Sequence, residues 1–268
     1  MLEGWSGVRG ARLGWTSTGD GPLVVFAHGM AGDRWYLERH GMLDWSAIPR
    51  TGRRLVRFDA RGHGVSTGGE DPLRPDHYTW AELARDLLDL VRDIDVGTGT
   101  GPIDAIGASM GTGTLLHAAV LAPHRFRRLI LSAPPTAWES RTAQAGMYEQ
   151  AASLIERRGM RAFEAALAQA PVPPAFANVT GNPSRLTVSE ELLPSILRGA
   201  AQSNLPPLST LATLQVPILL LAWGGDPVHP VSTAQQLAAI LPAARLYVAD
   251  TPEQLQTWGE LAAAFLDE

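Results

Sequence analysis

The sequence predicts an α/β fold: a mostly parallel central sheet with helices on both faces and a helical insertion. Three observations support this. Short apolar runs alternate with segments of helical period along most of the 268 residues. The segment Gly107-Ala108-Ser109-Met110-Gly111 lies between one such run and one such helix. The stretch 134–206, by contrast, shows helical patterns and no strand pattern.

Each expected element has its own local signal. A loosely alternating edge strand of an opening hairpin is expected over residues 8–15. The continuous apolar run 23–27 is typical of a parallel strand buried on both faces. Further strands are expected over residues 54–58, 102–106, 128–132, 216–222 and 244–249. Core helices are expected over residues 35–45, 80–94, 114–121, 232–241 and 252–266. A glycine-rich turn over residues 95–101 leads into the strand before Ser109.

The inserted stretch divides the chain. Helices are expected over residues 142–158, 160–170 and 189–201, with breaks at 171–174 and at Gly181-Asn182-Pro183. Strand–helix alternation resumes after residue 207. We therefore interpret residues 1–133 and 207–268 as an α/β core, and residues 134–206 as a helical cap over the edge of the sheet.

Composition excludes several classes of function. The formal net charge is −5 and no long basic run exists, so neither nucleic acid nor an anionic membrane is an expected partner. The chain has no cysteine, which excludes disulfides, thiol catalysis and thiolate metal sites. No ligand-like spacing of histidines and carboxylates occurs, so no metal or other cofactor is expected. Without a secretory pattern or a long apolar run, we expect a cytoplasmic protein, as a monomer or homodimer.

The glycines around Ser109 indicate a nucleophile elbow, the Gly-x-Ser-x-Gly turn between strand and helix. Such a sharp turn strains Ser109, and larger residues two positions before and after it would clash. The turn lifts the Ser109 hydroxyl above the sheet and aims the free N–H groups of the next helix at whatever it attacks. The alternative is that these small residues only pack a helix against a strand.

Further motifs follow the same order as in a known family. His28-Gly29 begins a glycine-rich loop after the strand 23–27, and Asp59-Ala60-Arg61-Gly62-His63-Gly64-Val65-Ser66 follows the next strand. An acidic loop with Asp226 and Pro230 comes after the insertion. Together with the elbow, these motifs resemble the α/β-hydrolase fold superfamily, most closely its capped small bacterial esterases, lactonases and C–C hydrolases. The resemblance covers nearly the whole chain.

The resemblance implies roles for particular residues. Ser109 is the expected nucleophile, and the backbone N–H groups of Met30 and Met110 are the expected oxyanion hole. Asp226 occupies the family's position for the carboxylate that orients a histidine. A turn aspartate before Pro227 is the alternative interpretation of Asp226.

The family's catalytic histidine is missing from its usual place. It normally follows the last strand, but here that strand is followed directly by Asp250-Thr251-Pro252, and no histidine occurs after His229. His229 lies three residues after Asp226 on the same loop. We therefore hypothesise that His229 fills the space of the missing loop and approaches Ser109. The alternative is a histidine that only lines the pocket or the surface.

Substrate contacts are expected from the loop His28-Gly29 and from Pro134 and Trp138 at the cap hinge. His28 has a second interpretation, in which it only shapes its loop. Large apolar residues could line a pocket under the cap or belong to ordinary core: Trp35, Trp80, Trp138, Trp223, Met30, Met110, Met147 and Phe176.

Two functions follow from these expectations. The first is a hydrolase that acts on a small, largely apolar carboxylic ester, lactone or thioester through a Ser109 acyl-enzyme, with Asp226 and a relocated His229. The second is a protein of the same fold with a degenerate triad, acting as a lyase, cyclase or isomerase, or binding a small molecule without catalysis.

Overall fold

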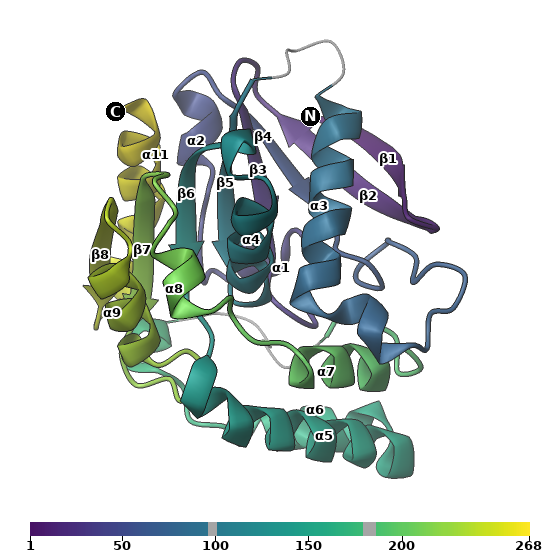
Figure 1. Cartoon of the computed structure of the whole chain (residues 1–268). Helices are drawn as coiled ribbons and strands as arrows, with labels where there is room; N and C mark the ends of the chain where they lie inside the picture. Colours follow the sequence, from purple (N-terminus) through teal and green to yellow (C-terminus); the bar gives the residue numbers. More distant parts are fainter. Residues whose placement is uncertain (96–100, 179–185) are drawn as a thin grey trace.

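The computed structural model describes residues 1–95, 101–178 and 186–268. Its centre is an eight-stranded sheet in the order β1-β2-β4-β3-β5-β6-β7-β8 (Figure 1). The strands are β1 (Leu2–Val8), β2 (Ala11–Thr18), β3 (Leu23–Ala27), β4 (Arg54–Phe58), β5 (Ile103–Ala108), β6 (Phe126–Ser132), β7 (Ile218–Trp223) and β8 (Ala244–Ala249). Strands β3 to β8 are parallel, and the hairpin β1–β2 joins β4 in antiparallel pairing. The predicted mostly parallel sheet is confirmed.

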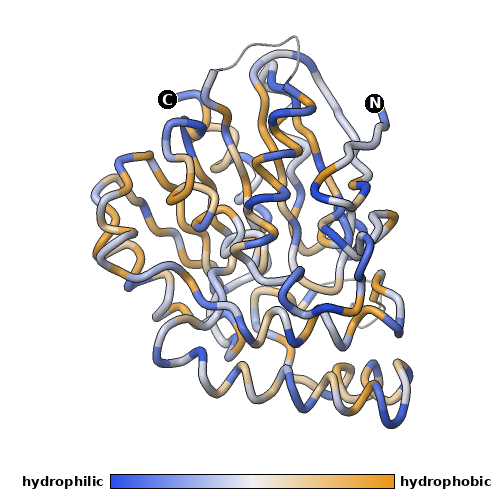
Figure 2. The backbone as a smooth tube through the Cα atoms, turned by 45° about the vertical axis from the view of Figure 1, so that its right-hand side comes forward, coloured by the Kyte–Doolittle hydropathy of each residue, from blue (hydrophilic) through white to orange (hydrophobic). Residues whose placement is uncertain are grey.

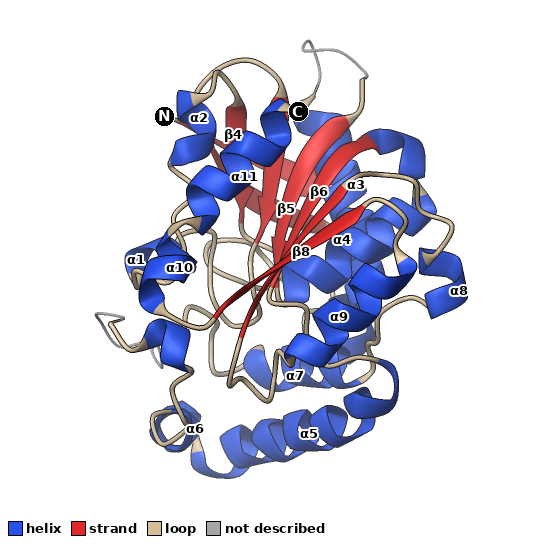
Figure 3. Cartoon of the chain, turned by 90° about the vertical axis from the view of Figure 1, so that its left-hand side faces the viewer, coloured by secondary structure: helices blue, strands red, loops and turns tan. Residues whose placement is uncertain are grey.

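Helices cover both faces of this sheet, as Figure 3 shows along its edge. One face is covered by α3 (Trp80–Ile94), α4 (Met110–Leu121), α8 (Leu208–Leu211) and α9 (Val231–Ile240). The other face is covered by α1 (Tyr36–Arg39), α2 (Ala47–Arg50), α10 (Pro252–Gln256) and α11 (Trp258–Asp267). Short 3₁₀ helices complete the chain: η1 (Pro75–Tyr78), η2 (Pro123–Arg125), η3 (Trp138–Ser140) and η4 (Pro174–Phe176).

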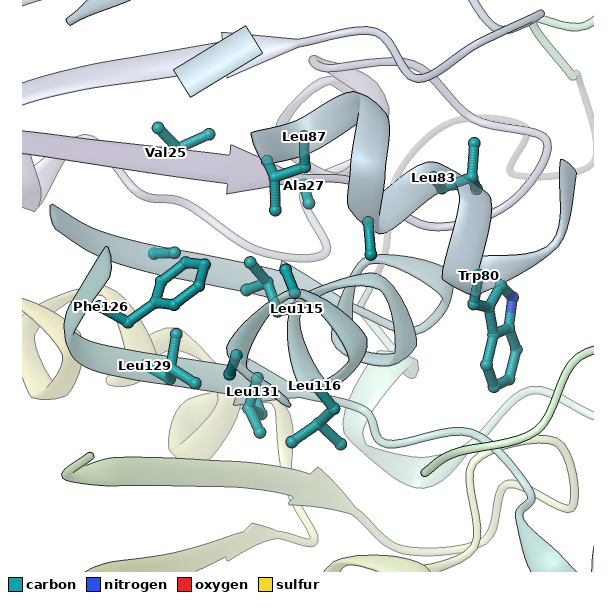
Figure 4. Close-up of a cluster of buried hydrophobic side chains, with 14 of the residues drawn as sticks. Val25, Ala27, Trp80, Leu83, Leu87, Leu115, Leu116, Phe126, Leu129 and Leu131 are labelled. Carbon is teal, nitrogen blue, oxygen red and sulfur yellow. The ribbon is translucent and has the colours of Figure 1, made fainter. Parts of the chain in front are cut away.

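Strand β3 shows how the sequence builds a core on each face. Val25 and Ala27 belong to one buried cluster, and Val24 and Phe26 belong to the other. Successive side chains of a strand point to opposite faces, so an uninterrupted apolar run is needed when both faces are covered. Figure 4 shows the first cluster between β3, β5, β6 and the helices α3 and α4. In Figure 2 the hydrophobic colour is concentrated in these inner elements.

Between β6 and β7 the chain forms α5 (Arg141–Arg158), α6 (Met160–Leu167) and α7 (Leu193–Ala201). These helices lie together beyond one end of the sheet, at the bottom of Figure 1. Buried residues of α5 and α7 form a third cluster with Ala31, which follows β3. The N–H of Thr187 also donates to the carbonyl of Ala31 at 3.0 Å. The helical segment therefore packs over the carboxyl end of β3, and the boundaries 134 and 206 stay an interpretation.

The prediction for the opening hairpin is wrong in its register. We expected one strand over residues 8–15, but the turn lies inside that run, between β1 and β2. Arg9 and Gly10 have φ values of 45° and 79°, the left-handed backbone that a tight hairpin turn requires. The loose alternation of side chains continued through the turn and concealed it.

Several predicted helices are shorter than expected. The segment 35–45 contains only α1, because the chain turns at Gly41 with φ of 65°. The segment 252–266 is divided into α10 and α11 at Thr257. Helix α7 begins at Leu193, where Pro194 suits a first helical turn. The breaks predicted at Gly181-Asn182-Pro183 and over most of 95–101 lie outside the described residues.

Within the described ranges, no helix combines the length and apolar character needed to cross a bilayer.

Candidate active site

Ser109 lies at the junction of β5 and α4 in a strained backbone conformation, with φ of 53° and ψ of −110°. A non-glycine residue with positive φ costs on the order of 1–3 kcal/mol and persists only where its surroundings hold it. Here the N–H of Ser109 donates to the carbonyl of Ser132 on β6 at 3.0 Å. The hydroxyls of Thr112 and Ser132 donate to the carbonyl of Gly107 at 3.1 and 2.9 Å. The neighbouring strand therefore fixes the turn.

The two glycines of the motif are required by close backbone contacts. A Cβ atom on Gly107 would lie 2.6 Å from the carbonyl oxygen of Gly111, and one on Gly111 would overlap the carbonyl oxygen of Ala27. The first contact is across the turn itself, and the second is to the end of β3. The elbow can therefore form only if both positions lack side chains.

Three side chains form one hydrogen-bonded chain. The Nε2 atom of His229 lies 2.7 Å from Oγ of Ser109, and its Nδ1 atom lies 2.7 Å from Oδ2 of Asp226. An ionised carboxylate only accepts hydrogen bonds, so Nδ1 carries the proton and Nε2 accepts from the Ser109 hydroxyl. The structure thus brings together the three residues that the sequence indicated, from segments 120 residues apart.

Asp226 is held in place from several sides. Its Oδ1 accepts the backbone N–H of Val228 at 2.8 Å, and its Oδ2 also accepts the indole N–H of Trp223 at 2.9 Å. Burial raises the pKa of Asp226. The hydrogen bond and charge of His229 and the hydrogen bonds from Trp223 and Val228 lower it by more, so the pKa lies well below its usual range. Asp226 is therefore a carboxylate at neutral pH.

The predicted oxyanion donors belong to the two segments next to Ser109, the start of α4 and the loop after β3. Met110 is the first residue of α4, so its N–H has no partner within the helix. Met30 follows Gly29, and a Cβ atom on Gly29 would lie 3.5 Å from Cβ of Ser109. Strands β3 and β5 are neighbours, which brings the ends of these two loops together. The function of the two N–H groups as an oxyanion hole stays a prediction.

His28 is placed inside the protein, with only 2% of its surface exposed. Its Nδ1 donates to the carbonyl of Gly29 at 2.7 Å, and its Nε2 accepts the N–H of Ala60 at 2.9 Å. Both ring nitrogens are thus used by the backbone, an arrangement that favours the role in shaping the loop over a contact with substrate.

The remaining predicted contacts, Pro134 and Trp138, lie in the segment that follows β6. Trp138 donates its backbone N–H to Asn204 at 2.8 Å and its indole N–H to the carbonyl of Pro206 at 3.1 Å. Pro134 is buried. These contacts tie the segment after β6 to the segment before α8, and a role of Trp138 or Pro134 toward substrate stays a prediction. Sequence reasoning treated Trp223 only as apolar and missed its bond to Asp226, although the two residues are three positions apart at a strand end.

Among residues 1–95, 101–178 and 186–268, no three His, Asp or Glu side chains are grouped so that they could hold a metal ion.

A model of the alpha/beta hydrolase family matches residues 24–255. The chain belongs to the alpha/beta hydrolase family. Over 192 residues it is 26% identical to 3-oxoadipate enol-lactonase 2 of Acinetobacter baylyi, covering 68% of this chain and 65% of that protein. Over 110 residues it is 32% identical to the sn-1-specific diacylglycerol lipase ABHD11 of Mus musculus, covering 41% of this chain and 32% of the lipase. The chain thus spans less than two thirds of either relative.

Solved structures share the whole fold. A hydrolase from Pseudomonas aeruginosa PA01 superposes with a TM-score of 0.80 at 22% identity, covering 99% of this chain and 98% of that one. The enol-lactonase from Burkholderia xenovorans LB400 has the same TM-score at 20% identity, covering 99% of this chain and all of the other. These likenesses confirm the α/β-hydrolase fold predicted from the sequence.

The elbow glycines give the first testable prediction. Gly107→Ala should lower the free energy of unfolding by about 2 kcal/mol or more, because its new Cβ forces apart a packed turn. The control is Gly146→Ala on α5, where a Cβ meets nothing within 4 Å. That change should raise the free energy of unfolding by about 0.5–1 kcal/mol, since alanine loses less entropy in a helix. Urea unfolding measures both, and similar effects of the two changes would contradict this account of the motif.

The buried histidines of the loops give a second prediction. Burial lowers the pKa of His28 to about 4, and burial together with the charge of His28 lowers that of His63 to about 3. In the unfolded chain both bind protons near pH 6.5, so the unfolded state gains protons first as the pH falls. Each histidine should therefore cost about 2 kcal/mol of stability at pH 5 relative to neutral pH.

The measurement is urea unfolding at several pH values between 7 and 5. His63→Asn should remove about half of this pH dependence, because an asparagine amide can replace the Nδ1 bond to the Arg61 carbonyl without titrating. His124→Gln on the exposed surface is the control for loss of an imidazole. A free energy of unfolding that stays constant from pH 7 to pH 5 would contradict the prediction.

Proposed function

We propose that this protein is a serine hydrolase that acts on a small, largely apolar carboxylic ester, lactone or thioester. Ser109 is the nucleophile, His229 the general base and Asp226 the residue that orients it. One observation carries the proposal: the Ser109 hydroxyl, the His229 imidazole and the Asp226 carboxylate are linked by two contacts of 2.7 Å. A serine hydroxyl is a weak nucleophile unless a base of this kind accepts its proton.

The reaction then follows from the positions of the protons. As Ser109 Oγ attacks the substrate carbonyl, its proton passes to Nε2 of His229, and Asp226 stabilises the imidazolium through Nδ1–H. When the tetrahedral intermediate collapses, Nε2 returns the proton to the leaving alcohol oxygen. A water molecule, deprotonated by the same nitrogen, attacks the acyl-enzyme and releases the acid and the free Ser109 hydroxyl.

The charge that develops on the carbonyl oxygen needs its own partners. The N–H groups of Met30 and Met110 are suited to this, since they come from the loop beside Ser109 and from the N-terminus of the 12-residue helix α4. Preorganised donors of this kind contribute roughly 3 kcal/mol each to stabilising the transition state. The Met30 loop lies beside Ser109 at Gly29, where an added Cβ would be in van der Waals contact with Cβ of Ser109 at 3.5 Å.

The class of substrate rests on two kinds of support. The relatives named above include an enol-lactonase and a lipase, whose reactions cleave lactone and ester bonds. The helical segment over the carboxyl end of β3 packs there with an apolar cluster that Met30 and Tyr148 contact. We accordingly retain residues 134–206 as a cap above an apolar site. The cytoplasmic location and the state as monomer or homodimer stay predictions.

The central test of this proposal is His229→Gln, assayed with p-nitrophenyl acetate. Loss of the base should lower kcat by about 10²–10⁴-fold, because proton transfer from Ser109 is no longer assisted. Glutamine keeps a polar side chain of similar length, so the loop should fold as before. His124→Gln, which removes an exposed imidazole, is the matched control and should leave kcat unchanged.

A fluorophosphonate probe distinguishes the hydrolase from the alternative of a degenerate triad. The wild-type protein should be labelled at Ser109, and His229→Gln should be labelled far more slowly. Folded wild-type protein that is not labelled would contradict the proposal and favour a non-hydrolytic enzyme or a binding protein. An unchanged kcat in His229→Gln would remove His229 from the mechanism.

A further inference from the structure

Trp223 is the last residue of β7 and contacts both members of the acid–base pair. Its indole N–H donates to Oδ2 of Asp226 at 2.9 Å, the same oxygen that accepts Nδ1–H of His229 at 2.7 Å. Its ring also meets the His229 ring edge to face, with centroids 5.6 Å apart. One carboxylate oxygen therefore has two side-chain donors, and one of them comes from the rigid sheet.

The indole itself is locked by its neighbours. Trp223 is 5% exposed and stacks on Trp258 of α11, with centroids 5.7 Å apart and an interplanar angle of 24°. The ring of Phe176 in η4 also packs edge to face against the Trp223 indole, with centroids 4.6 Å apart. A buried indole N–H needs one acceptor, and Asp226 supplies it.

The loop after Trp223 carries both Asp226 and His229. It begins with Gly224 and Gly225, and Gly225 has φ of 76°, a left-handed conformation that glycine adopts without strain. Asp226 and His229 are both on this loop, separated by two residues. Backbone bonds hold the loop at Gly224, whose N–H donates to the carbonyl of Ala249 at 3.2 Å, and at Val228, whose carbonyl accepts the N–H of Thr136 at 3.0 Å. The bond from Trp223 additionally ties the carboxylate side chain itself to the end of β7.

We propose that Trp223 is a positioning residue that fixes Asp226 against the sheet and, by sharing its Oδ2 atom, limits the basicity of His229. This inference rests on the proposed function. A carboxylate that already accepts an N–H is a weaker acceptor for a second donor, so it stabilises the imidazolium less. Removing the indole N–H should therefore make His229 easier to protonate.

Other polar groups around the pair come from three elements. The Ser109 hydroxyl approaches His229 from the elbow. Tyr148 of α5 faces the site from the cap; burial raises the pKa of its phenol, which is bonded to Arg141 and Gln144 and senses the charge of Asp226. Asp250, after β8, lies beside Gly224. Trp223 differs from these groups because it alone donates a side-chain N–H from the sheet to Asp226 within the described residues.

The test compares Trp223→Phe with Trp258→Phe. Phenylalanine at 223 keeps an aromatic ring beside His229 but removes the N–H together with part of the bicyclic ring. Trp258→Phe makes the same reduction in the stacked neighbour without touching Asp226. The readout is the pH dependence of kcat/KM for p-nitrophenyl acetate, together with kcat and KM separately. For Trp223→Phe we expect the acid limb to move up by about half to one pH unit. We also expect about a ten-fold loss of kcat at neutral pH with little change in KM.

Trp258→Phe should leave the acid limb in place. An acid limb that does not move in Trp223→Phe, or that moves equally in both variants, would overturn the proposal and make Trp223 a packing residue only. If Trp223→Phe fails to fold, benzothienylalanine at position 223 replaces the N–H by sulfur in a ring of nearly the same shape. The same shift is then expected.

A readout without turnover separates this proposal from the proposed function. The imidazole of His229 can be titrated by ¹⁵N NMR, where Trp223→Phe should raise its midpoint relative to wild type. If esterase activity is absent but this midpoint rises, the hydrolase proposal fails and the role of Trp223 stands. If His229→Gln abolishes activity while the midpoint in Trp223→Phe is unchanged, the hydrolase stands and the role of Trp223 is refuted.

Discussion

The contact between Nε2 of His229 and Oγ of Ser109, at 2.7 Å, is the interaction on which the site depends. It exists only because the strained turn at Ser109 lifts the hydroxyl above the sheet and because the loop after β7 reaches across β6 to meet it. The neighbouring strands β3 and β5 bring the Met30 loop to the same point. The contact therefore depends on the strand order and on the strained turn together. The sheet holds the ends of the loops in fixed positions, and the loops carry Ser109, Asp226 and His229.

Asp226 and His229 share one short loop. Between β8 and α10 lie only Asp250 and Thr251, and Thr251 caps the helix in a capping box with Gln254. With the imidazole on the β7 loop, the separation of Asp226 and His229 is set by local backbone geometry. Their alignment with Ser109 then depends on how firmly that loop is held, which explains the density of contacts from Trp223, Val228 and the stacked ring of Trp258.

The sequence predicted the sheet well because strands buried on both faces leave a continuous apolar run, as in residues 23–27 and 218–223. The elbow was predictable because its glycines are required by backbone contacts that any residue with a Cβ atom would break. The direction of the His229 side chain was only a hypothesis, since a loop of six residues between Trp223 and Pro230 can project an imidazole in many directions. The hairpin turn at Arg9-Gly10 and the indole bond to Asp226 depend on tertiary pairing, which local pattern does not encode.

The most direct test of the central claim is a crystal structure of the protein after reaction with a small fluorophosphonate. The account predicts a covalent bond from Ser109 Oγ to phosphorus, with the phosphonyl oxygen about 3 Å from the N–H groups of both Met30 and Met110. Nε2 of His229 should remain within hydrogen-bond distance of an oxygen on the adduct, and Nδ1 should remain bonded to Asp226. A structure with an unmodified Ser109, or with His229 turned away from the adduct, would contradict it.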